Sequence, residues 1–218
     1  MSEQYDEHEQ SERVKQWLLK NGSNLLTVLL LLIASIFGWH WWQNKQSQQS
    51  QEAGNQYQTF LSAIEKPDLV KAQALGEAVM ANYAKTDYAF LAAMRLAKLH
   101  ADGGQYEKAM AALNKASGLT ENPQNLELAS LRKAQLWLAQ GNIEEAGKST
   151  AAIKGAYFPA SLAETKADIA VGRGDNAKAI TLYREALSKL DADASSRALI
   201  ELKLSDAGGT VEKPQEIR

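Results

Sequence analysis

The sequence predicts an all-α protein in which a single N-terminal transmembrane helix is followed by an α-solenoid of short helical hairpins. Two observations support this prediction. Residues 21–44 contain no charged side chain, and later residues repeat a turn with small residues around it about every 34 positions. Proline occurs only four times in 218 residues, and the alanine-rich composition favours packed helices over sheets.

Residues 22–42 have the length and composition of a transmembrane helix. At about 1.5 Å per residue they extend over roughly 31 Å, which matches the hydrocarbon core of a bilayer. Trp39, Trp41 and Trp42 gather at one end, where amphipathic rings favour the lipid headgroups. A cleaved signal peptide and a soluble core helix are the alternatives, but residues 25–37 are followed by bulky rings instead of a small-residue cleavage site.

Positive charges near this span predict its orientation. Arg13, Lys15 and Lys20 precede it. An equal length after it contains one basic residue, Lys45. Because cytoplasmic flanks carry the excess of Lys and Arg, residues 1–21 are predicted to be a cytoplasmic tail and the C-terminal part to be exported. The reversed topology, with the repeats in the cytosol, is the alternative.

Residues 43–56 form a polar segment rich in glutamine and serine. A flexible linker and a polar extension of the membrane helix both fit this composition. The helix is slightly favoured, because glutamine forms helices readily and no proline or glycine interrupts the segment before Gly54.

Residues 57–204 contain the repeats. The helix-breaking residues of four turns, Pro67, Gly104, Gly141 and Gly174, are separated by 37, 37 and 33 residues. An alanine stands five residues after each of them, and another stands seven residues before each of the three glycines. A fixed period with small residues at fixed positions is typical of a helical solenoid, and a generic alanine-rich bundle is the alternative. These alanines are Ala72, Ala97, Ala109, Ala134, Ala146, Ala167 and Ala179.

Proline and glycine also predict where the array begins and ends its helices. Pro123 and Pro159 are expected at the first position of their helices, where proline removes no intrahelical hydrogen bond. Ser196–Leu204 is predicted to be a final helix that caps the array. Residues 205–218, which contain two adjacent glycines and Pro214, are predicted to be a flexible C-terminal tail.

The repeat positions resemble the tetratricopeptide repeat, most closely over Ala93–Ser117. In that family a small residue on the first helix of a hairpin faces a small residue on the second. Such arrays expose the inner faces of their first helices as a groove for an extended or helical peptide. The alternative is that these positions pack against neighbouring helices. By repeat phase, the predicted partner-binding positions are Tyr57, Leu61, Leu91, Met94, Lys98, Leu128, Leu131, Gln135 and Leu138.

Composition and charge argue against catalysis and against nucleic acid as a partner. The chain has 24 basic and 26 acidic residues and no cysteine, so it offers neither a strongly basic surface nor a thiolate nucleophile. Its three histidines, His8, His40 and His100, fall in separate parts of the predicted topology. We therefore expect a non-enzymatic protein with no catalytic, cofactor-binding or metal-binding residues. A hydrolase, which would need a nucleophile–base pair, is the alternative.

The segment that precedes the repeats carries a closer resemblance. Val14–Gly22 reads VKQWLLKNG, and Gly38–Trp42 lies between the leucine-rich span and the polar segment. This layout resembles the YfgM family, the ancillary subunits of the bacterial SecYEG translocon. The resemblance implies a single-pass protein of the bacterial inner membrane, with a cytoplasmic N-terminus, a periplasmic repeat domain and membrane lipid around the span. It also implies association with the SecYEG translocon and with a PpiD-type periplasmic chaperone.

Composition and spacing by themselves predict only a membrane-anchored scaffold of helical repeats. The resemblance implies a more specific function, a translocon adaptor that helps pass exported client proteins to periplasmic chaperones. The alternative is an envelope-stress regulator, in which the N-terminal tail with its amphipathic stretch Val14–Leu19 acts on a cytosolic response regulator of the RcsB type.

Overall fold

The computed structural model describes residues 3–66, 69–155, 157–191 and 193–211, and the regular elements in these ranges are α-helices. The chain divides into two compact units, Met1–Gln51 and Glu52–Arg218. The helices are α1 (Glu3–Ile64), α2 (Leu69–Asn82), α3 (Asp87–Asp102), α4 (Tyr106–Gly118), α5 (Pro123–Ala139), α6 (Ile143–Ala151), α7 (Pro159–Gly172), α8 (Asn176–Ser188) and α9 (Arg197–Asp206).

The first unit is the N-terminal part of α1, and it contains the apolar segment. Among the described residues, one helix is long and apolar enough to cross a membrane, over a stretch that begins at Leu26. Inside it, the hydroxyl groups of Thr27 and Ser35 donate to the carbonyl oxygens of Ser23 and Leu31, at 2.9 and 2.8 Å. The helix thus provides acceptors for its own hydroxyl groups, as a hydrocarbon environment requires.

Aromatic rings mark the C-terminal end of the apolar segment. The ring centroids of Trp39 and Trp42 are 5.6 Å apart. The ammonium group of Lys45 lies 5.3 Å from the centroid of the Trp41 ring, within the range of a cation–π interaction. Tryptophan rings next to a lysine are the arrangement expected where a helix leaves the hydrocarbon and enters the headgroup layer.

The polar segment 43–56 is helical, because α1 continues through it to Ile64. Of the two alternatives, the segment therefore takes the form of a helix extension. Most side chains from residue 43 to residue 52 are exposed, so the helix here depends on its own backbone hydrogen bonds and on the helix propensity of glutamine.

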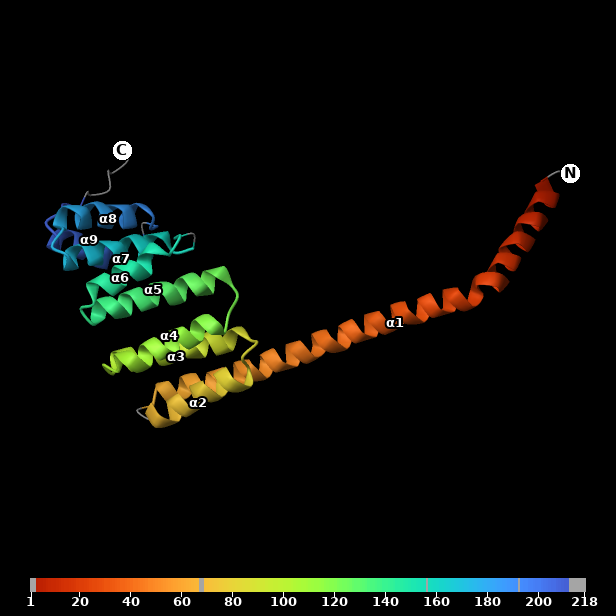
Figure 1. The fold of residues 1–218 in the computed structure, drawn as a ribbon, viewed down its shortest axis with the longest axis horizontal. Helices are drawn as coiled ribbons and strands as arrows, with labels where there is room; N and C mark the ends of the chain where they lie inside the picture. The colour runs from red at the N-terminus through yellow and green to blue at the C-terminus, as the bar shows by residue number, and fades with distance from the viewer. Residues whose placement is uncertain (1–2, 67–68, 156, 192, 212–218) are drawn as a thin grey trace. The chain divides into compact units, whose positions relative to one another are not determined.

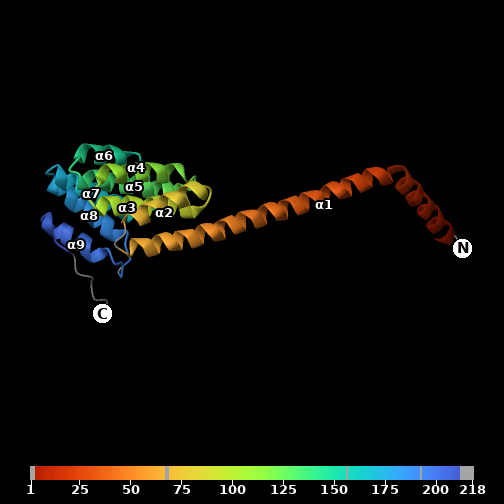
Figure 2. The same ribbon diagram turned by 90° about the horizontal axis from the view of Figure 1, so that it is seen from below.

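The second unit is an array of helical hairpins, which confirms the predicted all-α solenoid. Helix α3 pairs with α4, α5 with α6, and α7 with α8, in a stack that follows the chain order (Figure 1). Neighbouring hairpins meet where α4 packs on α5 and α6 packs on α7. Helix α9 packs on α8 at the end of the array (Figure 2).

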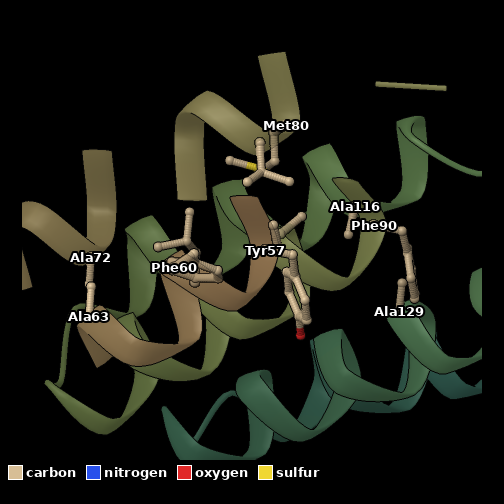
Figure 3. Close-up of a cluster of buried hydrophobic side chains, with 12 residues drawn as sticks. Tyr57, Phe60, Ala63, Ala72, Met80, Phe90, Ala116 and Ala129 are labelled. Atoms are coloured by element: carbon tan, nitrogen blue, oxygen red, sulfur yellow. The ribbon is translucent and has the colours of Figure 1, made fainter. Parts of the chain in front are cut away.

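The last turns of α1 and helix α2 share a buried apolar cluster at the start of the array. Phe60 of α1 and Phe90 of α3 are fully buried in one cluster with Ala63, Ala72 and Met80 (Figure 3). This cluster contains Tyr57, Phe60 and Ala63 from the end of α1, and it fixes those turns in the array.

Three turns of the array share one backbone geometry. Gly104, Gly141 and Gly174 have φ values of +69°, +75° and +76°, which glycine adopts without the steric penalty of a side chain. In each turn the N–H of the next residue donates to the carbonyl oxygen five positions before it, at 2.8 to 2.9 Å. This bond caps the end of the first helix and reverses the chain, so the predicted turns are confirmed.

The seven alanines at repeat positions are all buried, with at most 4% of their surface exposed. Because an alanine side chain is a single methyl group, the two helices of a hairpin can approach closely there, and larger residues fill the gaps beside it. Leu113 and Tyr183, each one turn after such an alanine on a second helix, are 3% and 2% exposed. The small-residue register is thus confirmed.

Helix ends also follow the prediction. Pro123 and Pro159 are the first residues of α5 and α7. The capping helix α9 extends to Asp206, and Ala207 still packs in the C-terminal cluster, so order continues past the predicted boundary at residue 204. Residues 212–218 of the predicted tail lie outside the described residues.

Candidate functional site

A cavity of about 620 Å³ lies between α3 and α5 of the second unit. Its walls are mostly aliphatic side chains from these two helices, and Leu113 of α4 and Tyr57 of α1 complete the lining. Tyr57 also belongs to the buried cluster around Phe60, with the two ring centroids 6.0 Å apart (Figure 3), so it joins the groove wall to the core. We call this surface the α3–α5 groove. Six of the nine predicted partner-binding positions line it, namely Tyr57, Leu91, Met94, Lys98, Leu128 and Gln135.

The other three predicted positions, Leu61, Leu131 and Leu138, do not line the groove. Leu131 is only 2% exposed and belongs to the core of the array. Leu61 packs against the cluster around Phe60, and Leu138 is half-buried. Repeat phase alone could not distinguish these residues from those that line the groove. Helix α5 contacts α3, α4, α6 and α7, so only part of its surface reaches the cavity.

Sequence reasoning missed two arginines of the groove, Arg95 and Arg132. They occupy equivalent positions of successive repeats, since they are 37 residues apart, as are Gly104 and Gly141. Each stands four residues after a predicted groove leucine and therefore on the same helix face. This spacing could have predicted that the two arginines lie beside the groove. Charged residues on an amphipathic helix are, however, normally interpreted as solvent-exposed surface.

A chain of hydrogen bonds holds Arg132 in place. Its Nη1 donates to Oε1 of Gln135 at 2.7 Å, and Nε2 of Gln135 donates to Oγ1 of Thr165 on α7 at 3.3 Å. Thr165 is buried (1% exposed), and its hydroxyl donates to the carbonyl oxygen of Ser161 at 2.8 Å. The guanidinium group of Arg132 is thereby linked to the interior of the next hairpin.

The charges of the groove are of one sign. Its lining contains Arg95, Lys98 and Arg132 and no acidic residue. Lys98 pairs at 2.8 Å with Asp102, one turn further along α3, but both side chains are more than 60% exposed and such a pair is weak. The site therefore combines an apolar surface with a positive rim, and it can bind apolar side chains together with anionic groups.

Among the residues that the structure describes, no three or more His, Cys, Asp or Glu side chains gather closely enough to hold a metal ion.

Comparison with known proteins identifies the array. A family model described as a tetratricopeptide repeat-like domain matches residues 15–209. The chain belongs to this family.

Several relatives match this tetratricopeptide repeat-like chain over most of its length. A Haemophilus influenzae protein is 27% identical over 186 residues, which cover 85% of this chain and 91% of the relative. An Escherichia coli protein is 26% identical over 92% of this chain and 96% of its own length. A protein from Aggregatibacter actinomycetemcomitans is 24% identical over 92% of this chain and 97% of its own length. All three are named ancillary SecYEG translocon subunit, which confirms the resemblance seen in the N-terminal segment. No solved structure matches the chain.

A second polar cluster of the tetratricopeptide repeat-like domain attaches its capping helix. Nζ of Lys203 on α9 lies 2.8 Å from Oε1 of Glu164 and 2.8 Å from Oδ2 of Asp168, both on α7. The hydroxyl of Tyr183 on α8 donates to the other oxygen of Asp168 at 2.6 Å. Burial, reinforced by this bond, raises the pKa of Tyr183. Burial lowers the pKa of Lys203, but the two carboxylates outweigh it and the net change is upward.

A buried carboxylate joins two hairpins of the domain. Glu127 of α5, only 9% exposed, accepts the backbone N–H groups of Tyr157 and Phe158 at 3.0 and 2.8 Å. Phe158 is the N-cap residue of α7, so the carboxylate lies where the partial positive charge of that helix is greatest. These two hydrogen bonds attach the start of α7 to α5 and so hold the two hairpins together.

Proposed function

We propose that this chain is a membrane-anchored, non-enzymatic adaptor of the bacterial SecYEG translocon. One observation carries the proposal, the match to ancillary SecYEG translocon subunits over 85% to 92% of the chain, which includes both the apolar helix and the repeats. The apolar N-terminal stretch of α1 supports a membrane anchor, and the repeat array supports binding of partner proteins.

The proposed topology places the N-terminus in the cytoplasm and the repeat domain in the periplasm of an inner-membrane protein. The excess of basic residues before the span supports this orientation. Fusions of a cytosolic and a periplasmic reporter after Arg218 test it. Activity of the periplasmic reporter alone is the expected result, and activity of the cytosolic reporter alone would reverse the topology.

The proposed partners of the periplasmic domain are translocon subunits, a PpiD-type chaperone and exported client proteins, and the adaptor helps pass those clients onward. The α3–α5 groove supports this part of the proposal, because it is a mostly apolar cavity of about 620 Å³ on the repeat array. Its volume lies within the range of roughly 300 to 1,000 Å³ that is usual for binding pockets.

Photocrosslinking in intact cells tests the adaptor. A photoreactive amino acid at Leu91, which lines the groove and is 40% exposed, is expected to crosslink translocon subunits, the chaperone or exported chains. The same amino acid at Lys115, exposed on α4 outside the groove lining, is the control and is expected to give fewer products. Recovery of neither translocon subunits nor exported chains from Leu91 or from other positions of the domain would refute the adaptor.

An envelope-stress regulator is a second candidate function. The observation that favours it is a set of exposed apolar side chains before the span, among them Val14 and Trp17, next to an acidic tail. Here the tail would act on a cytosolic response regulator of the RcsB type. Deletion of residues 2–12 separates the candidates, because a change in the stress response with intact translocon crosslinks supports regulation by the tail. No change in that response eliminates this candidate.

A further inference from the structure

We infer that the α3–α5 groove binds an acidic, apolar peptide segment, in which Asp or Glu side chains flank the apolar residues that enter the cavity. The inference rests on the proposed adaptor function, and it names the chemistry of the segment that the adaptor would bind.

The positive charge of the groove is local. From Lys45 to the C-terminus the chain has 21 basic and 21 acidic residues, so this part of the protein is neutral as a whole. The groove lining nevertheless contains three basic residues and no acidic one. A cleft whose charges share one sign favours ligands of the opposite sign, and its apolar walls strengthen the field inside it.

Two of the three cations lack an acidic partner. Within the described part of the chain, Arg95 and Arg132 form no ion pair, and the only side-chain bond to Arg132 is from its guanidinium to the neutral amide of Gln135. Gln135 orients Arg132 through its link to the buried Thr165 and leaves the charge uncompensated. A guanidinium group held in this way loses less side-chain entropy when it binds a carboxylate, which it can do through two parallel hydrogen bonds.

The walls between these cations suit apolar side chains. Leu91 and Met94 of α3 face the cavity together with Leu128 and Leu136 of α5. Methionine adapts its shape to different partners, so the site does not require one fixed apolar sequence. The occupant must therefore combine apolar side chains with carboxylates.

A peptide fits the arrangement better than a single anionic lipid headgroup. Arg95 and Arg132 belong to successive repeats, so the positive rim extends along two hairpins. Repeat arrays use such extended surfaces for chain-like ligands. Phosphate groups also bind guanidinium, and the experiment below includes lipid as an outcome.

Binding of two matched peptides to the full chain tests the inference. The chain is placed in nanodiscs of neutral phosphatidylcholine, and fluorescence anisotropy follows a short amphipathic peptide of leucine and glutamate or the same peptide with glutamine at every glutamate. The glutamate peptide is expected to bind about tenfold more tightly than the glutamine peptide at low salt. This difference is expected to shrink in 0.5 M NaCl, where charges on the surface are screened over distances of a few ångström (~4 Å).

Variants assign the binding to the groove. The double substitution Arg95→Gln and Arg132→Gln is expected to reduce the affinity for the glutamate peptide to that for the glutamine peptide, with the affinity for the latter unchanged. Both arginines are exposed, so the fold is expected to persist, and circular dichroism checks it. Lys108→Gln with Lys115→Gln removes two exposed cations of α4 outside the groove lining, and this control is expected to bind like the parent chain.

Three results would overturn the inference. The first is equal affinity of the parent chain for the two peptides. The second is a loss of affinity in the Lys108→Gln, Lys115→Gln control as large as that in the double arginine variant. The third is displacement of the glutamate peptide by soluble short-chain phosphatidylglycerol at a lower concentration than by unlabelled peptide, which would assign the groove to lipid. The adaptor function has a separate readout, the crosslinks in cells. If the parent chain gives no translocon crosslinks but the peptide results hold, the proposed function fails and the groove chemistry stands.

Discussion

Removal of the Glu127 carboxylate tests how successive hairpins are joined. This side chain of α5 is 9% exposed and accepts two backbone N–H groups, those of Tyr157 and Phe158, at the start of α7. The substitution Glu127→Ala removes the acceptor from both groups. Glu127→Gln keeps an acceptor oxygen at the same place, removes the negative charge and replaces the other carboxylate oxygen with an NH₂ group.

The expected magnitude follows from these contacts. A hydrogen bond to a charged group contributes about 1.5–3 kcal/mol to stability. Tyr157 is 48% exposed, so water replaces part of the loss, and we expect Glu127→Ala to lower the free energy of unfolding by about 2–4 kcal/mol. At roughly 2–4 °C per kcal/mol for a unit of this size, Tm falls by about 4–16 °C. Glu127→Gln keeps both hydrogen bonds but makes their acceptor neutral and loses the interaction with the helix dipole, so we expect a smaller loss of about 1–2 kcal/mol.

Two measurements on the full chain in nanodiscs check this ranking. Thermal unfolding followed by circular dichroism gives Tm, and hydrogen–deuterium exchange reports protection of the amides of Tyr157 and Phe158. Glu121→Ala, at an exposed position before α5, is the control and is expected to leave both unchanged. If Glu127→Ala melts within about 2 °C of the parent chain, or if Glu127→Gln is the less stable of the two, the two hydrogen bonds do not hold the hairpins together.

Three further predictions concern packing, turns and pH. Gly76→Ala places a Cβ 2.8 Å from a leucine side chain. The overpacking costs about 1–3 kcal/mol and outweighs a gain of about 1 kcal/mol in helix propensity, so Tm is expected to fall. Gly118→Ala is the control, because it has open space around it and is not expected to lower Tm. Gly141→Ala forces a side chain onto a φ of +75° and lowers the free energy of unfolding in urea by about 1–2 kcal/mol. The pKa values of Tyr183 and Lys203 are raised in the folded chain, so their stabilisation is present below the ordinary values of 10.0 and 10.5 and is lost as the pH rises through the folded values. Tyr183→Phe is expected to reduce this alkaline loss in melts between pH 9 and pH 11, and an unchanged slope would contradict the assignment to Tyr183.

The hairpin register could be predicted from the sequence because it depends on local chemistry. Only glycine adopts a φ near +75° without penalty, so Gly141 and Gly174 mark turns wherever they recur at a fixed spacing. Only a small residue allows two helix backbones to approach closely, so the alanines at fixed phase predicted the buried faces. The sequence did not decide the conformation of the polar segment 43–56, because its composition is compatible with both a helix and a chain without fixed structure.

The groove could be predicted only in part, because its shape depends on which helices are neighbours. Leu128 and Leu131 have the same character and neighbouring phases, yet Leu128 faces the cavity and Leu131 packs inside the array. The charges of Arg95 and Arg132 become a property of one site only when α3 and α5 lie next to each other. The role of Glu127 could not be predicted from the sequence, because the residues whose N–H groups it accepts are 30 and 31 positions further along the chain.

The turns at Gly104 and Gly141 have a consequence for how such proteins can change length. Each turn is closed by a glycine and a backbone hydrogen bond, so no side chain from elsewhere is needed to complete it. Duplication of one 37-residue module would therefore insert a new pair of helices in register, whereas loss of a single residue inside a helix would rotate everything after it by about 100°. A duplicated module would also bring its own arginine, and the binding surface would lengthen by one guanidinium group with each copy.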